Sequence, residues 1–219
     1  FFSMIENGIG NSMTVKIDEM IMRTINNLIA ATVLDANDNR YVKLLSLYNG
    51  WFSKSLTANQ ALTNPEFIRW ASYTMGLYAS RMQKLSVLFN IGGKERFTPA
   101  DKLNIVILDQ FAQAANIYLQ SDVYHNEFTK LPNAETVPFW QGSGKYYNLE
   151  DTSTVFTADV TVHFVIGVMF DHDALGVTCL DRRVTSNYNP RGEFYNNWYK
   201  FDAGYFNDQN ENFVVFTLE

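Results

Sequence analysis

Two segments in the first half of the chain have apolar positions at helical spacing. Residues 14–36 place one apolar stripe along about six turns, formed by Ile17, Met20, Ile21, Ile25 and Leu28. A second helix is predicted after Asn64, which suits an N-cap, and Pro65, which suits the first turn. Its apolar face carries Phe67, Ala71, Tyr78, Met82, Leu85 and Phe89. Both patterns predict helices that pack one face on a core.

The second half favours strands. "LNIVIL", residues 103–108, is almost wholly apolar, as expected of a strand covered on both faces, and Asp109 after it can cap a helix. "VFTADVTVHFVIGVMF" predicts one or two strands that end just before Asp171, and "NFVVFTL" predicts a terminal strand. Helices first and mostly strands later indicate an α+β fold rather than regular βαβ winding.

Residues 188–216, "YNPRGEFYNNWYKFDAGYFNDQNENFVVF", hold ten Phe, Tyr and Trp residues separated by Asn, Asp and Gly. This pattern neither alternates like a half-buried strand nor omits polar residues like a buried one. Two uses of the aromatic surface remain: stacking on sugars or bases, or forming the core of an interface with protein. We expect Phe201, Phe206 and Phe213 to pack internally.

Composition and charge narrow the class of protein. The 219 residues are 47% hydrophobic, enough for a full core, and the single cysteine, Cys179, excludes an intrachain disulfide and favours a small packed side chain. The net charge is −6, with ten Lys/Arg against seven Asp/Glu in residues 1–98 and seven against sixteen in residues 99–219. This asymmetry favours head-to-tail self-association, and the acidic balance argues against duplex nucleic acid as a direct ligand.

The ends and the loops add three expectations. No apolar run is long enough to span a bilayer, and "FFSM" reads as a strand already under way, so we expect a processed product or a piece of a longer chain. "NGIGNS" predicts a turn before the first helix. A long loop over residues 131–147 carries Trp140 among other aromatics, and long aromatic loops are usually functional.

Candidate catalytic groups are few. Asp171 and Asp173 in "VIGVMFDHD" could hold a divalent cation, as in metal-dependent glycosyltransferases, but Asp171 also suits the cap of a short turn beginning "HDALG". We favour the structural interpretation, since no phosphate-cradling glycine loop accompanies the pair. His163 is expected to be a solvated or core residue. The side chains of His125 and Glu127 would not share a face of a helix, which argues against an acid/base pair. We therefore predict a non-enzyme without catalytic residues, metal or cofactor.

Several blocks of the chain resemble the major capsid proteins of tailed bacteriophages with the Hong Kong 97-type fold. They are "TNPEFIRWAS", "GGKERFTPADKLNIVILDQFA", "YLQSDVYHNEFTKLP", "VPFWQGSG", "VIGVMFDHDALGV" and the stretch from residue 181 to 216. The resemblance implies a structural subunit of an icosahedral shell that forms hexamers and pentamers of itself. It also implies a place in the virion, assembly in the bacterial cytoplasm, no membrane, and contact with packaged DNA that is not sequence-specific. Scaffolding, portal or decoration proteins are further implied partners.

The resemblance also divides the chain. It implies that residues 1–40 are the end of an extended loop or arm region plus the spine helix of a peripheral domain. Residues 41–195 are then mainly an axial domain, and residues 196–219 return to the peripheral domain with the terminal strand.

Six residues are predicted to lie at contacts between subunits: Arg182, Arg183, Tyr188, Arg191, Trp198 and Trp140. The turn signal "YNPRGE" would hold Tyr188 and Arg191 on a surface, and Arg suits a neighbour's carboxylate. Exposed Trp and Tyr beside Asn also suit sugar stacking, so a carbohydrate-binding or adhesion module is the first alternative. A metal-dependent glycosyltransferase is the second.

Overall fold

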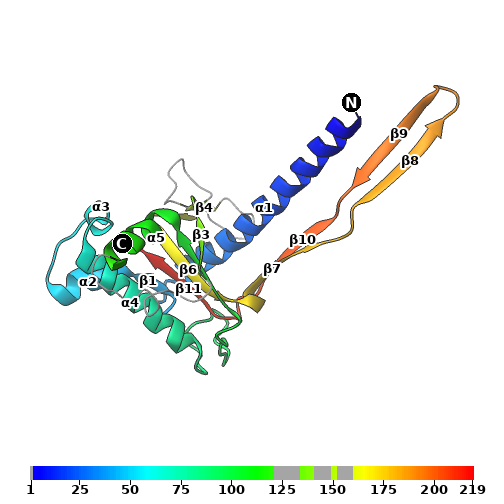
Figure 1. The fold of residues 1–219 in the computed structure, drawn as a ribbon. Helices are drawn as coiled ribbons and strands as arrows, with labels where there is room; N and C mark the ends of the chain where they lie inside the picture. Colours follow the sequence, from blue (N-terminus) through cyan, green and yellow to red (C-terminus); the bar gives the residue numbers. More distant parts are fainter. Residues whose placement is uncertain (1, 121–133, 141–148, 152–159) are drawn as a thin grey trace.

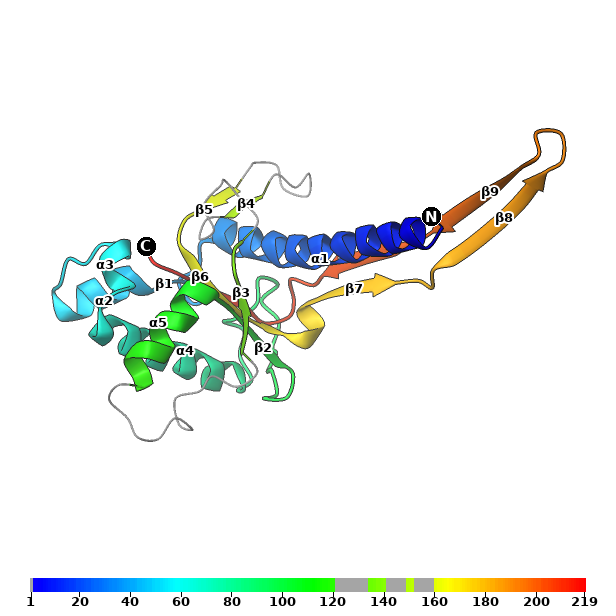
Figure 2. The same ribbon diagram turned by 45° about the horizontal axis from the view of Figure 1, so that its top comes forward.

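The computed structural model describes residues 2–120, 134–140, 149–151 and 160–219 of the chain. These residues form a body with helices on both faces of a sheet, and a long arm that projects from it (Figure 1). We define the arm as residues 175–207 and the body as the rest, apart from the N-terminal half of the first helix, which runs beside the arm (Figure 2). The combination of a long helix with antiparallel strands confirms the α+β prediction.

The body is organised around a five-stranded sheet in the order β1-β11-β6-β2-β3. These strands are β1 (Tyr41–Lys43), β11 (Phe213–Thr217), β6 (Val165–Asp171), β2 (Leu103–Leu108) and β3 (Ala134–Val137). β11 pairs antiparallel with β6 and β6 antiparallel with β2, while the two outer pairings, β1 with β11 and β2 with β3, are parallel. The predicted strands at residues 103–108, before Asp171 and at the C-terminal end are confirmed.

Alternating side chains of the central strands enter two separate hydrophobic clusters, one on each face. On one face Ile105, Val214 and Phe216 pack against α2 (Leu44–Phe52) and α4 (Pro65–Met82), and residues of α5 (Asp109–Gln120) join them. On the other face Val106 and Val215 pack against the C-terminal half of α1 (Phe2–Asp35). The short helix α3 (Ala58–Ala61) lies between α2 and α4, and a small sheet of β4 (Leu149–Asp151) and β5 (Val160–Val162) lies beside α1.

The second predicted helix forms as expected at its start. The Asn64 side chain accepts hydrogen bonds from the backbone N–H groups of Glu66 and Phe67, and Pro65 occupies the first turn. The helix ends at Met82, earlier than predicted, so Leu85 lies outside it and is exposed. Phe89 still reaches the core, from the loop that follows. Asp109 is the first residue of α5 rather than a residue before it.

The first helix is longer than the sequence predicted. It begins at Phe2, so the segments read as a strand ("FFSM") and as a turn ("NGIGNS") are helical from that residue onward. Its buried residues lie between Thr24 and Thr32, while most residues before them are exposed. The helix is therefore held by the core only at its C-terminal end. Among the described residues, no helix has an apolar stretch of the length that crossing a bilayer requires.

The arm is a two-stranded ribbon in two sections. β7 (Leu175–Cys179) pairs antiparallel with β10 (Ala203–Asn207) next to the body, and β8 (Arg183–Asn189) pairs antiparallel with β9 (Phe194–Lys200) farther out. A backbone hydrogen bond of 2.9 Å from Leu180 N–H to Asp202 O joins the sections. The short 3₁₀ helix η1 (His172–Ala174) connects β6 to β7, so the arm is inserted between two neighbouring strands of the body sheet.

Candidate assembly interface

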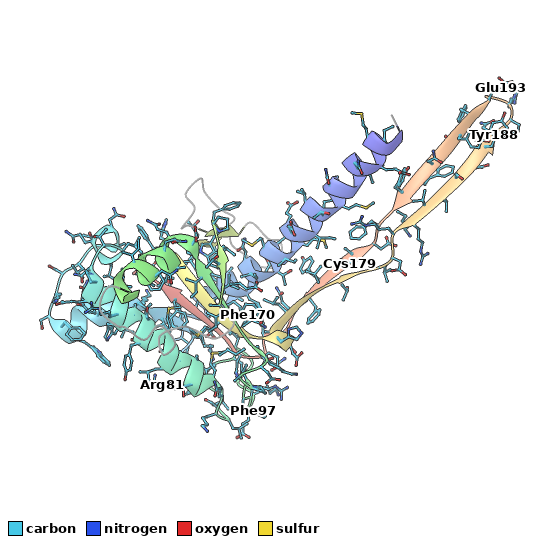
Figure 3. The ribbon with its side chains drawn as sticks, in the orientation of Figure 1. Arg81, Phe97, Phe170, Cys179, Tyr188 and Glu193 are labelled. Carbon is cyan, nitrogen blue, oxygen red and sulfur yellow. The ribbon has the colours of Figure 1, made fainter. Side chains whose placement is uncertain are left out.

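Five of the six residues predicted at subunit contacts lie on the outer section of the arm. Arg182, Arg183, Tyr188, Arg191 and Trp198 are all exposed. Figure 3 shows Tyr188 and Glu193 at the far end, well beyond the first turn of α1. The structure thus brings together residues that sequence reasoning selected singly, and it does so on one projecting element.

The pairing register determines which side chains share a face of this ribbon, because residues directly opposite each other point the same way. Tyr188 is opposite Tyr195 and Val184 opposite Tyr199 on one face, whereas Trp198 is opposite Thr185 on the other. The rings of Tyr188 and Tyr195 lie 4.8 Å apart between centroids. Tyr195 is 70% exposed and Trp198 51% exposed, so aromatic surface faces outward on both sides of the ribbon.

The turn at the end of the arm is well defined by local hydrogen bonds. Asn189 Oδ1 accepts from the backbone N–H of Arg191 at 3.1 Å and of Gly192 at 3.3 Å, which is the side-chain turn that Asn favours. Glu193 has a positive φ of 53°. The Phe194 ring lies over Gly192, where a Cβ atom would come within 2.4 Å of it. The predicted turn at "YNPRGE" is confirmed.

The base of the outer section faces the N-terminal half of α1 across an open groove. The larger hollow has a volume of about 650 Å³ and the smaller about 200 Å³, and both are lined by Ile9, Met13 and Tyr199. Ile5, Lys16, Trp198 and Phe201 also line the larger one. Glu6 and a cationic group of Arg182, Arg183 and Lys200 surround the smaller one. We call this region the α1–arm groove.

Trp140, the sixth predicted contact residue, is in the core instead. Its side chain is 2% exposed, packs in the cluster on the α1 face of the sheet, and donates from Nε1 to Val165 O at 2.9 Å. Burial with a satisfied indole N–H is the normal state of a core tryptophan. The prediction for Trp140 is therefore wrong, because an aromatic residue in a loop can belong to the core as easily as to a surface.

The structure corrects the predictions for Cys179 and Phe206 and confirms those for Phe213 and for His163 as a solvated residue. Cys179 is exposed on the arm rather than packed. Phe213 is buried as predicted, but Phe206 lies over Gly176 and is about half exposed, and Phe201 lines the groove. His163 is exposed between β5 and β6, while His125 and Glu127 lie outside the residues that the structure describes.

Asp171 and Asp173 have structural roles. Asp171 caps η1, accepting from the backbone N–H of Asp173 at 3.0 Å, and is buried. Asp173 pairs with Lys102, whose Nζ lies 2.7 Å from Oδ2, and this hydrogen bond lowers the pKa of Asp173 and raises that of Lys102. Within the described ranges, no group of three or more His, Cys, Asp or Glu side chains is placed to hold a metal ion.

Sequence reasoning missed several residues of this surface. Phe194 and Tyr195 belong to the aromatic stretch but are not among the predicted contact residues. Ile9 lies in the predicted turn "NGIGNS", and Met13 lies between that turn and the predicted helix. The spacing of Val184, Tyr188, Tyr195 and Tyr199 follows one face of a hairpin closed by "NPRG". A search for paired strands around that turn would have found them.

The comparisons with known proteins concern the whole chain. The sequence profile of the Phi29-like phage major capsid proteins matches residues 1–217. Among solved structures, the capsid of Staphylococcus phage Andhra matches with 12% identity and a TM-score of 0.49, covering 100% of this chain and 65% of that one. This chain thus spans less than two thirds of the length of that capsid chain. No curated protein sequence gives a significant match. Because the profile extends over nearly all residues, the chain belongs to the Phi29-like phage major capsid protein family, and with it to the structural subunits of phage capsids.

Proposed function

We propose that the arm is the main element by which this capsid subunit binds its neighbours. The observation that supports this is the exposure of aromatic side chains on both faces of a ribbon that has little core of its own. A two-stranded ribbon is marginally stable alone in water, and interface cores favour Tyr, Trp, Phe and Arg. An arm of this composition gains stability when another subunit covers it.

The shell proposed here consists of hexamers and pentamers of the chain, of the Hong Kong 97 type, with α1 as the spine helix. The arm and the exposed half of α1 form the peripheral part and the body forms the axial part. The peripheral part then includes residues 175–207 as one unit, because a boundary after residue 195 would cut through β9. The terminal strand β11 belongs to the body, since it pairs with β1 and β6.

The location and the partners that the resemblance implies are also part of this proposal. The subunit acts in the virion after assembly in the host cytoplasm, meets scaffolding, portal or decoration proteins there, and encloses DNA without reading its sequence. It has no catalytic role, and this is supported by the engagement of Asp171 in a cap and of Asp173 in an ion pair.

Alanine variants at Arg182, Arg191 and Trp198 test the proposal. We expect each variant to keep the circular dichroism spectrum of the subunit and to lose particles in electron micrographs, because truncating an interface anchor costs about 2 kcal/mol or more. Trp51→Ala is the matched control, since Trp51 is 74% exposed on the body. An equal loss of particles in Trp51→Ala would contradict a special role of the arm.

The same variants address the carbohydrate-binding alternative, which the exposed Trp198 beside Asn197 favours. Wild-type particle yield for Trp198→Ala, together with lost retention on immobilised glycan, would move the assignment to that alternative.

A further inference from the structure

We infer that residues 89–102, here called the clamp segment, fix the direction in which the arm leaves the body. The clamp segment lies between α4 and β2, and it contacts both connections of the arm. These connections are η1, which leads from β6 into the arm, and residues 208–212, which lead back into β11. The clamp segment is thus a positioning element for the arm, and its value for assembly rests on the proposed function.

Lys102 holds the outgoing connection in two ways. Its backbone oxygen accepts a hydrogen bond of 2.9 Å from the N–H of His172, the first residue of η1. Its Nζ lies 2.7 Å from Oδ2 of Asp173, the next residue of η1. One residue of the clamp segment therefore binds both the backbone and a side chain of the turn from which the arm starts.

The returning connection lies against the middle of the clamp segment. The backbone N–H of Gly92 donates to Gln209 O at 2.9 Å. Arg96 Nε donates to Glu211 Oε1 at 3.0 Å. A Cβ atom at Gly92 would come within 2.2 Å of Asn210 Oδ1 and within 3.3 Å of the Asn210 Cα atom. The returning connection therefore packs directly against the backbone at this position.

A buried hydrogen bond completes this contact. Asn212 donates from Nδ2 to Thr98 Oγ1 at 3.0 Å, and both residues are almost fully buried. Leaving such groups unpaired is costly, so this bond favours one position of the connection over others. The Asp208 N–H donates to Ala174 O at 2.8 Å and joins the two connections. Whatever holds one connection thus also restrains the other.

The clamp segment is itself fixed to the body. Phe89 packs in the hydrophobic cluster on the α4 face of the sheet. The buried Arg40 donates to Asn90 O at 2.5 Å. The backbone N–H of Thr98 donates to Met82 O, at the end of α4, at 2.8 Å. The arm is therefore held by a support that is anchored at several points of the body.

α1 is a second support at the root of the arm, since it lies along β7 and β10 (Figure 2). It contacts the inner section of the ribbon, whereas the clamp segment bonds the connections themselves. The inference assigns the direction of the arm to the clamp segment rather than to α1. An arm held in one direction binds a neighbour at a lower entropic cost than an arm that swings.

Distances between two nitroxide labels test this inference, measured by double electron–electron resonance on the unassembled full chain. One label is attached to Cys179, the only cysteine in the sequence, which is exposed on β7. The other is attached to Tyr73→Cys on α4, where the native side chain is 65% exposed. The width of the distance distribution then reports how far the arm swings relative to the body.

Two variants loosen the clamp segment at different points. Gly92→Ala places a methyl group against the returning connection, and Thr98→Val removes the hydrogen-bond acceptor of Asn212 without changing the side-chain shape much. Gly204→Ala on β10 is the matched control, because a Cβ atom there meets Thr178 Oγ1 at an ordinary 3.5 Å. Circular dichroism checks that each variant is folded.

We expect a narrow distribution in the wild type and in Gly204→Ala, and a roughly twofold broader one in both clamp variants. A narrow distribution centred at another distance in Gly92→Ala would also support the inference, because the arm would then be redirected. Unchanged distributions in both clamp variants would overturn it, since α1 would then fix the direction of the arm.

The proposed function fails separately from this inference. The alanine variants at Arg182, Arg191 and Trp198 leave the clamp segment intact and test whether the arm binds neighbours. Loss of particles in those variants, with unchanged distributions in the clamp variants, would overturn the inference alone. Wild-type particle yield in those variants, with broadened distributions in the clamp variants, would contradict the proposed function and support the inference.

Discussion

The body buries many of its aromatic side chains, although Trp51 and Tyr73 on it are exposed, whereas no aromatic side chain of the arm is buried. Phe67, Phe111 and Phe216 have almost no contact with solvent, while Tyr195 and Trp198 on the arm are more than half exposed. Both regions use hydrogen-bonded strands, but only the body sheet has a hydrophobic cluster on each face. The difference indicates that the body is stabilised within one chain, and in our proposal the arm gains stability from neighbouring subunits.

The largest expected effect is on the free energy of unfolding of the isolated subunit, and it should differ between the body and the arm. Phe216→Ala should destabilise the isolated subunit by about 3–5 kcal/mol, because Phe216 is fully buried in the central sheet and its ring meets Tyr78 edge-on at 5.5 Å. Trp198→Ala, a truncation of similar size on the arm, should change it by less than about 0.5 kcal/mol. Urea unfolding of unassembled subunits measures both. Similar losses would show that the arm is stabilised by its own chain.

A second prediction removes a buried cation from the body. Arg40 is 6% exposed, and its guanidinium bonds the Asp35 carboxylate at 3.0 Å and the carbonyl oxygen of Asn90 at 2.5 Å. Arg40→Ala leaves these acceptors without their donor and should cost about 2–3 kcal/mol. Arg191→Ala, the same change on the arm, should not alter the unfolding midpoint of the isolated subunit. An unchanged midpoint for Arg40→Ala would mean that water replaces the arginine.

The junction between body and arm gives a smaller effect. Asp171→Ala should cost about 1 kcal/mol, since it removes the cap of η1 and leaves the Asp173 N–H without its acceptor. The measurement is thermal unfolding, with Asp173→Ala as the control on the exposed side. Tight, stoichiometric binding of Mn²⁺ that disappears in Asp171→Asn would refute the structural role of this residue.

Gly8 lies in the exposed N-terminal half of α1, which runs beside the arm and outside the body. Gly8→Ala should stabilise α1 by about 0.5–1 kcal/mol, because alanine is the better helix former and its Cβ meets no atom of this chain. If a neighbouring subunit packs closely on this part of α1, the same methyl group should lower particle yield. Gly50→Ala in α2, where space is also open, should stabilise its helix without affecting assembly. Raised particle yield in Gly8→Ala would argue against a neighbour packed closely at this position.

The smallest effect is a dependence on pH at the surface of the body. Because Lys102 lowers the pKa of Asp173 in the folded protein, the stability from this pair is present above the unfolded pKa of aspartate. It is lost as the pH falls through the lower folded value. Both groups are exposed, so the contribution is slight. Comparing acid unfolding of wild type and Asp173→Asn should show a shallower dependence in the variant, and identical curves would exclude the pair as a contributor.

The body was largely predictable from sequence because burial leaves a pattern. The cap at Asn64, the apolar strand at residues 103–108 and the cap at Asp171 each follow from local rules that the core enforces. The burial of Trp140 could not be derived, since a tryptophan in a loop belongs to no helical or strand periodicity.

The arm and the start of α1 were harder for a physical reason. Neither face of the β8–β9 ribbon is buried in this chain. No core therefore requires the alternation of apolar and polar residues by which a strand is recognised in a sequence. In "NGIGNS" the local preferences of Gly and Asn indicate a turn, yet the segment is helical without core contacts. The first case concerns a surface that, in our proposal, a neighbouring subunit covers.

The insertion of the arm between β6 and β11 has a mechanical consequence. β6 leads through η1 into the arm, and the arm returns through residues 208–212 into β11, so both connections leave the same end of two paired strands. Tension on the arm is therefore passed to β6 and β11 together, which pair with β2 on one side and with β1 on the other. The central sheet thus acts as the anchor for any force that neighbouring subunits transmit through the arm.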